Sequence, residues 1–339
     1  MADLDTNVTA LRPKAKDVTA ALRSKRARRK RKAKLPLRRD SNFAKCATGA
    51  SLPEVSRAWR AINREEAMKK LISALWLIST LATGAAWAQP YAPNDAGVTN
   101  GHWHLNSRDV AANKHILLAM GGVATGPGER VVFPGVLVIL NQGPSTPPST
   151  GGTVGTVVNH IGFTVPNVQE AVAKWKAAGV PFEPGAPGRL DQGWVTTTDG
   201  LKIEIQEDKD QKEPIRSKHV HFFLPENAIA ESQAWYGKIF GAKASMRNNA
   251  PVSDVPGVQL RWSKANVAEG PTKGRVLDHI GFDVKDLKAF IAKVEAAGVK
   301  LDADGAYRVN DVGVGIAFIT DPWGTRIELN ERPKAVYLP

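Results

Sequence analysis

The sequence predicts an α+β protein in which four βαβββ units follow one another along the chain. The first observation is a repeat: four similar segments open with histidines that are 58, 59 and 60 residues apart, and a fixed period of this size indicates repeated supersecondary units. The second is that apolar and polar side chains alternate in each segment, as in a half-buried strand. The third is that a helical pattern and shorter strand-like runs follow each segment. The segments are HWHLNSRD from His102, HIGFTVPN from His160, HVHFFLPE from His219 and HIGFDVKD from His279.

The alternation places the leading histidines on one face of their strands. Side chains at positions i and i+2 of a strand share a face. In the fourth unit His279 and Gly281 therefore share one face, while Ile280 and Phe282 take the other, which would pack on the following helix. We therefore expect the histidine side chains to point away from the helices and to be available as ligands.

Helix signals follow these strands. Asn167 and Asp286 are predicted N-caps of helices that end before Gly179 and Gly298, and apolar residues recur at helical spacing between them. The third unit has the same pattern up to Gly241, whereas the first unit shows only a short apolar run. The last strands of the second and fourth units, KIEIQ and RIELN, follow turns with the sequences DG and DPWG.

A single βαβββ unit leaves one face of its sheet uncovered, so the units should pair around a shared surface. We expect consecutive units to pair into cupped sheets, which gives one domain at residues 101–210 and another at 211–332; pairing across the chain is left open. The remaining segments are expected to be a disordered basic segment (1–67), a signal peptide (68–88), a linker (89–100) and a C-terminal tail (333–339).

The N-terminal 67 residues carry most of the net charge. They hold 18 of the 46 basic and 7 of the 33 acidic residues, which leaves 28 basic and 26 acidic residues, a net charge of +2, for the rest of the chain. The basic run SKRARRKRKAK, which ends at Lys34, contains no aromatic side chain, and such runs stay solvated. No specific nucleic-acid partner is therefore expected. The single cysteine, Cys46, also lies in this segment, so the mature protein should have no disulfide.

Residues 68–88 have the composition of a secretory signal peptide. Two lysines precede an apolar run of 11 residues, Leu71–Leu81, and the sequence AWA before Gln89 supplies the small-x-small cleavage pattern. The run is too short to span a bilayer comfortably. We therefore expect a periplasmic or secreted protein with no stable membrane anchor after cleavage, whose native start is Met68. An uncleaved inner-membrane anchor is the alternative.

The four repeats resemble the vicinal oxygen chelate superfamily, which includes glyoxalases, extradiol dioxygenases, fosfomycin-resistance transferases and bleomycin-binding proteins. The resemblance covers about residues 101–332, and the histidine-led strands and the closing strands KIEIQ and RIELN carry it. It implies two glyoxalase/dioxygenase-like cupped-sheet domains, each made of paired βαβββ units around a divalent metal ion.

In this family the metal ligands are the histidine that opens a unit and the glutamate in a unit's last strand. With consecutive units paired, the resemblance implies a primary site made of His219, His279 and Glu328. It implies a secondary site made of His102, His160 and Glu204. Two neutral imidazoles and one carboxylate leave positions on a divalent ion for water and substrate. One divalent ion is expected as the cofactor, with Fe, Mn, Zn and Ni all open.

Departures from the family's patterns bear on the reaction. Glyoxalase-type sites resemble a four-ligand arrangement with a second glutamate, but the last strand of the first unit, VVFPGVLVILNQ, has no carboxylate, and the third unit has Arg261 at the equivalent position. The closing motif DPWGTRIE resembles that of extradiol dioxygenases, yet Phe318 stands where those enzymes have a tyrosine. His221 and His104, each two residues beyond a predicted ligand, are the expected proton-transfer residues.

The expected function is that of an exported, metal-dependent enzyme whose small substrate chelates the metal through oxygen, with dioxygenase, lyase or isomerase chemistry. The alternative is a non-catalytic protein that binds a small molecule, as the bleomycin-resistance relatives do. A small-molecule partner is expected in both cases, and a homodimer is left open. The sequence contains no P-loop, dinucleotide-binding fingerprint or GxSxG motif that would indicate another class of enzyme.

Overall fold

The computed structural model describes residues 91–126, 128–141 and 149–332. The predicted basic segment, signal peptide and C-terminal tail lie outside the described residues. Within the described ranges, no helix is both long and apolar enough to cross a membrane.

The first two units have the element order βαβββ that the repeat predicts, including the first unit, whose helix signal is weak. The first unit consists of β1 (Val98–Asn106), α3 (Val110–Ala119), β2 (Val123–Ala124), β3 (Arg130–Phe133) and β4 (Val136–Asn141). The second consists of β5 (Val158–Val165), α4 (Val168–Ala177), β6 (Glu183–Pro184), β7 (Gln192–Thr196) and β8 (Lys202–Glu207). Strand β1 begins at Val98, inside the segment expected to be a linker.

The last two units repeat this order. The third consists of β9 (Arg216–Leu224), α5 (Glu226–Phe240), β10 (Lys243–Arg247), β11 (Ala250–Val255) and β12 (Val258–Lys264). The fourth consists of β13 (Leu277–Val284), α6 (Leu287–Ala296), β14 (Arg308–Val309), β15 (Gly315–Thr320) and β16 (Arg326–Glu331). The predicted N-caps are confirmed, because the side chains of Asn167 and Asp286 accept hydrogen bonds from the backbone three residues on.

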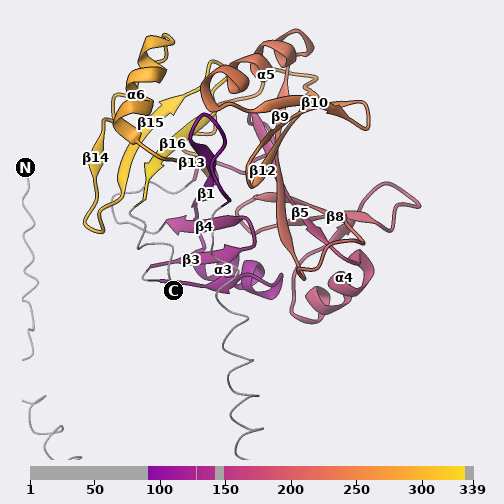
Figure 1. Cartoon of the computed structure of the whole chain (residues 1–339). Coiled ribbons are helices and arrows are strands. Elements are labelled where there is room, and N and C mark those ends of the chain that lie inside the picture. The colour runs from indigo at the N-terminus through magenta and orange to yellow at the C-terminus, as the bar shows by residue number, and fades with distance from the viewer. Residues whose placement is uncertain (1–90, 127, 142–148, 333–339) are drawn as a thin grey trace, which may run out of the picture. The chain divides into compact units, whose positions relative to one another are not determined.

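The strands of the described residues form two eight-stranded mixed sheets, and two units share each sheet (Figure 1). The order β14-β15-β16-β13-β1-β4-β3-β2 joins the fourth unit to the first, and we call it the terminal sheet. The order β10-β11-β12-β9-β5-β8-β7-β6 joins the third unit to the second, and we call it the central sheet. In each sheet the first strands of the two units lie antiparallel to each other at the centre.

This pairing corrects the expectation that consecutive units share a sheet. The first strand of every unit pairs with the last strand of its own unit on one edge, which leaves its other edge for a partner. Strand β1 uses that edge to bind β13 rather than β5. Backbone hydrogen bonds extend this ladder beyond both strand ends, because Lys285 N donates to Gly97 O and Asn106 N donates to Val276 O. The first and fourth units are therefore fixed together along the full length of β1.

The helices cover the sheet faces that lie opposite the histidines. Helix α5 lies against β10, β11 and β12, and α6 lies against β15 and β16 (Figure 1). Ile280 and Phe282 of β13 are buried on this side, as the alternation predicts, and the rings of Phe240 and Phe282 are 4.5 Å apart. Burial of one such phenylalanine contributes about 1.5–3 kcal/mol, so this face supplies the hydrophobic core. The opposite face is left for polar side chains.

Consecutive units are joined by polar contacts from the turn before a last strand. In the second unit Asp199 accepts hydrogen bonds from Ser107 Oγ at 2.8 Å and from Asn113 Nδ2 at 2.7 Å, both in the first unit. In the fourth unit Asp321 accepts a hydrogen bond from the Tyr236 hydroxyl of the third unit at 2.8 Å. Consecutive units therefore pack side by side without sharing a sheet.

Substitution of Tyr236 by phenylalanine is expected to lower the free energy of unfolding by about 1.5–3 kcal/mol, the value of a buried hydrogen bond to a charged group. The ring stays buried in the core, so only the bond to Asp321 is lost. Urea denaturation measures the change, and Tyr307→Phe, at a 39% exposed position, is the matched control with an expected change within about 0.5 kcal/mol. Equal effects of the two substitutions would show that the hydrogen bond from Tyr236 to Asp321 does not stabilise the contact between the third and fourth units.

Candidate metal centres

Two clusters of histidine and glutamate lie on the polar faces of the two sheets. The terminal cluster, on the terminal sheet, consists of His102, His104, His279 and Glu328. The central cluster, on the central sheet, consists of His160, Glu204, His219 and His221. Within each cluster the candidate ligand atoms all lie within 4.8 Å of one another. These are the candidate metal centres of the described residues.

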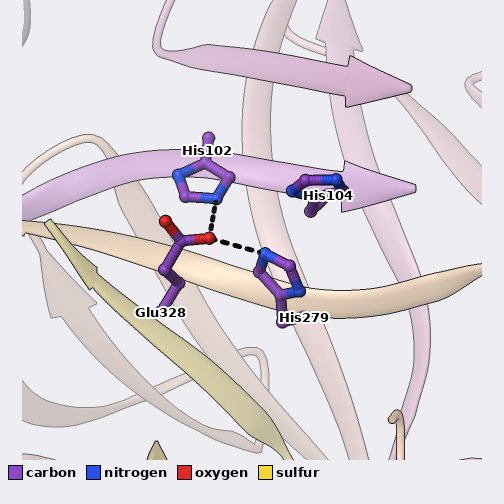
Figure 2. A group of neighbouring side chains, drawn as sticks. All are labelled: His102, His104, His279 and Glu328. Atoms are coloured by element: carbon purple, nitrogen blue, oxygen red, sulfur yellow. Dashed lines mark hydrogen bonds and ion pairs between the residues drawn. The ribbon is translucent and has the colours of Figure 1, made fainter. Parts of the chain in front are cut away.

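In the terminal cluster two histidines converge on one carboxylate oxygen (Figure 2). Glu328 Oε2 lies 2.8 Å from His279 Nε2 and 3.3 Å from His102 Nε2. Two ligands that each lie 2.0–2.2 Å from one divalent ion are themselves about 3 Å apart. The three side chains therefore fit a two-histidine, one-carboxylate metal site without rearrangement of the backbone.

A glycine allows this convergence. In the sheet register Gly281 of β13 stands between Glu328 of β16 and His102 of β1. A Cβ atom at position 281 would lie only 2.1 Å from His102 Cε1, so the ring occupies the space that a side chain would fill. Neighbouring strands are about 4.8 Å apart, and the two side chains meet by leaning over the glycine. The glycine of the HIGF sequence is thus a seat for the histidine of the partner unit.

Polar side chains behind the candidate ligands of the terminal cluster hold those ligands in place. Asp278 Oδ1 accepts a hydrogen bond from His279 Nδ1 at 2.7 Å, and Asn330 Nδ2 donates to Glu328 Oε1 at 2.7 Å. A carboxylate behind a ligating imidazole fixes its tautomer and raises its basicity. Arg332 Nη2 lies 3.4 Å from His102 Nδ1 and also binds Asp283. The terminal cluster is therefore supported by charged groups.

His104 lies beside the ligands without a partner of its own. Neither ring nitrogen of His104 has a hydrogen-bond partner among the described residues, and its ring centroid is 4.4 Å from that of His279. Phe318 packs edge-on against His279 at 5.0 Å, and the guanidinium of Arg326 lies 4.4 Å from its ring centroid. A phenylalanine, which has no proton to donate, therefore packs beside His279, and both ring nitrogens of the neighbouring His104 are without a partner among the described residues.

The central cluster repeats the geometry of the terminal one. Glu204 Oε2 lies 3.1 Å from His219 Nε2 and 3.4 Å from His160 Nε2. Gly162 seats the His219 ring, because a Cβ atom at position 162 would lie 2.1 Å from His219 Cε1. Trp194 packs edge-on against His160 at 4.9 Å, in the place that Phe318 takes in the terminal cluster.

The hydrogen bonds of the central cluster differ from those of the terminal one. His160 Nδ1 lies 2.9 Å from Asn159 Oδ1, so this nitrogen carries a proton and the Nε2 atom of His160 has a lone pair. His221 Nδ1 lies 2.9 Å from that Nε2 atom, and Ser263 Oγ lies 2.8 Å from His221 Nε2. The Nδ1–H of His221 thus occupies the lone pair that His160 would offer to a metal ion. An amide stands behind His160, where Asp278 stands behind His279.

Burial and neighbouring charges set the protonation states. Burial lowers the pKa of His160 to about 4 and that of His221 to about 2, so both imidazoles are neutral at pH 7, as ligation requires. Burial alone would lower the pKa of His279, but hydrogen bonds to Asp278 and Glu328 raise it above its ordinary value. Burial alone would raise the pKa of Glu328, but the neighbouring histidines hold it well below its usual range.

The structure exchanges one histidine between the two triads expected from the sequence. Glu328 and His279 meet His102 rather than His219, and Glu204 and His160 meet His219 rather than His102. The cause is the pairing of β1 with β13, which brings the first unit to the fourth. Of the two residues expected to transfer protons, His104 lies in the terminal cluster and His221 in the central cluster.

Three features of the site were not predicted from the sequence. They are the seats at Gly162 and Gly281 and the carboxylate of Asp278. The signals were present, since both glycines occur in HIGF and aspartate precedes His279 where asparagine precedes His160. The register pairs Ile139 with His104 and Arg261 with His221, so these two residues stand at the positions that correspond to Glu328 and Glu204.

Two comparisons with known proteins found similar proteins, and a third found none. Residues 218–329 match the family described as Glyoxalase/Bleomycin resistance protein/Dioxygenase superfamily. Glyoxalase I from Zea mays is similar in structure, with a TM-score of 0.53 and 16% identity over 69% of this chain and 92% of that chain. A virulence protein from Salmonella typhimurium aligns with a TM-score of 0.29 and 15% identity over 35% of this chain and 97% of that chain. No curated protein sequence matches the chain significantly.

The fold and the two sites define a protein of duplicated βαβββ units with two buried His/Glu clusters that could hold a metal ion. Residues 218–329 carry a domain of the glyoxalase/bleomycin resistance/dioxygenase superfamily, also called the vicinal oxygen chelate superfamily.

Proposed function

We propose that this protein is an exported, metal-dependent enzyme that acts on a small oxygen-bearing substrate at the terminal cluster. The observation that carries the proposal is the convergence of His102 and His279 on Glu328, with Asp278 behind one imidazole and His104 unpartnered beside it. Export rests on the signal-like residues 68–88 of the sequence.

His102, His279 and Glu328 would hold the divalent ion, which when bound supplies a Lewis acid for the oxygen atoms of the substrate. Glu328 provides the negative charge, and Asn330 keeps its second oxygen turned away from His279. Asp278 holds His279 by its Nδ1 proton, which directs the Nε2 atom to the site. The donor set leaves Zn, Mn, Ni and Fe open.

His104 would move a proton between substrate and solvent. Burial and the neighbouring His279 hold the pKa of His104 well below its ordinary value, so the ring is neutral at pH 7 and can accept a proton at an unpartnered nitrogen. Proton transfer of this kind favours isomerase or lyase chemistry, because Phe318 cannot donate a proton as the tyrosine of ring-cleaving dioxygenases would.

Metal binding is the first test. Addition of Zn²⁺, Mn²⁺ or Ni²⁺ to protein treated with EDTA should raise its melting temperature. An ion at 100 times its dissociation constant stabilises the folded state by about 2.7 kcal/mol, which corresponds to roughly 5–10 °C for a chain of this size. Differential scanning fluorimetry and elemental analysis of the same samples provide the measurement.

The control is His115→Gln, which changes a histidine of α3 outside both clusters and should leave the shift intact. Protein that holds no stoichiometric metal and gains no stability from any of these ions would contradict a metal-dependent enzyme. That result would favour the binding protein that is the alternative within the superfamily.

A further inference from the structure

One of the differences between the two clusters changes the charge beside the ligands, at positions that the sheet register makes equivalent. In the terminal sheet Ile139 of β4 pairs with His104, and in the central sheet Arg261 of β12 pairs with His221. Paired residues of neighbouring strands project from the same face. An arginine therefore lies beside the central cluster where the terminal cluster has an isoleucine.

Arg261 lacks a counter-ion in the part of the chain that the structure describes. Its Nε atom is buried and has no hydrogen-bond partner among those residues. The nearby acidic groups are already engaged: Asp254 accepts a bond from Arg247 at 2.6 Å, and Glu204 accepts bonds from Gln192 and Gln206. A guanidinium is always charged, and a partly buried charge without a partner is costly.

The groups around Arg261 suit an anion rather than a second cation. Arg261 of β12 pairs with His221 of β9 in the sheet register, so its positive charge lies on the same face as the cluster. Lys202 adds a positive charge at the other side of the cluster, with its Nζ atom 4.0 Å from the centroid of Trp194. The side chain behind His160 is the neutral Asn159, and not a carboxylate such as the Asp278 that lies behind His279, so it does not offset these positive charges.

We propose that the central cluster binds a small 2-hydroxy acid, with the ligand carboxylate on Arg261 and its hydroxyl directed toward His219, whose Nε2 atom has no hydrogen-bond partner among the described residues. A guanidinium presents a planar fork of N–H groups that matches a carboxylate. The terminal cluster has an apolar side chain at the equivalent position and takes ligands without that negative charge. This binding rests on the proposed function in one respect only, that each cluster is a ligand-binding site. Catalysis at the central cluster is not required.

Binding of glycolate tests the proposal, with glycolamide as its neutral isostere. Ligand-observed NMR titrations of the full protein, once loaded with Zn²⁺ and once treated with EDTA, give the two dissociation constants. The wild type should bind glycolate at least about tenfold more tightly than glycolamide. Arg261→Ile should abolish this preference, and Ile139→Arg should create a second glycolate site.

Arg308→Ile is the matched control. Arg308 is an exposed arginine on β14, with its guanidinium 5.5 Å from the centroid of Phe318 beside the terminal cluster. This variant should retain the preference for glycolate. If Arg261→Ile does not fold, Arg261→Lys keeps the charge but loses the fork, and should weaken glycolate binding while glycolamide binding stays the same.

A preference for glycolate that survives in Arg261→Ile, or that disappears in Arg308→Ile instead, would overturn the proposal. Failure of the wild type to prefer glycolate would overturn it as well. Elemental analysis of the same samples reports metal content separately. If the protein binds metal but Arg261→Ile keeps the preference for glycolate, this proposal fails and the proposed metal-dependent function stands. If Arg261→Ile loses the preference but the protein binds no metal, the proposed function fails and this proposal stands.

Discussion

Glutamine at position 328 is expected to abolish metal binding by the terminal cluster. The substitution keeps the shape of the side chain but removes the charge on which His102 and His279 converge. Loss of a group in the second shell of a metal site already costs about 10–100-fold in affinity, so loss of this ligand should cost at least about 100-fold. Elemental analysis and the metal-induced shift in melting temperature measure the effect.

Substitution of His102 and of His219 tests which of these two histidines binds metal together with Glu328. His102→Gln should reproduce the loss seen in Glu328→Gln, and the double substitution should cost little more because the ligands act as one unit. His219→Gln should instead affect the central cluster, together with Glu204→Gln. If His219→Gln removed the metal bound by Glu328, the terminal site described by the sheet register would be wrong.

Alanine at position 281 is expected to disrupt the terminal cluster without touching a ligand. Its Cβ atom would lie 2.1 Å from His102 Cε1, so the ring must leave Glu328. Overpacking of this kind costs about 1–3 kcal/mol, and metal bound by this cluster should be lost with the position of the ring. Urea denaturation and metal content are the two measurements. Gly162→Ala should do the same to the central cluster through His219.

A glycine on a helix provides the control for this substitution. At Gly237 of α5 an added Cβ atom would meet only Ala242 O, at 3.4 Å, so Gly237→Ala should be neutral or should stabilise the helix by up to about 1 kcal/mol. Retention of full metal content in Gly281→Ala would show that the ring of His102 does not need this seat.

The donor set could be predicted from the sequence, but the partners within it could not. The first and third units both supply an HxH segment, and the second and fourth both supply HIGF and a glutamate. Pairing of consecutive units and pairing of the first with the fourth therefore give clusters of identical composition. Which pairing forms depends on the strand that binds the edge of β1 opposite β4. That strand is β13, and it is held there by backbone hydrogen bonds, which no distinctive sequence encodes.

Local patterns predicted the fold well, because each βαβββ unit is encoded by short-range signals. The caps at Asn167 and Asp286 and the alternation around Ile280 and Phe282 are properties of adjacent residues. The steric role of Gly281 was not predictable in this way, because it depends on a ring that lies 179 positions earlier in the chain.

The sharing of one sheet by the first and fourth units has a consequence for the order of assembly. His102 and Glu328 are separated by 226 positions, so the terminal site cannot exist until β16 has been synthesised, whereas the central sheet is complete once β12 has emerged. Closing so long a loop carries an entropic cost, which an ion held between the two ends would offset. Metal capture at this sheet would then follow the synthesis of β16 and would report that both ends of the terminal sheet have come together.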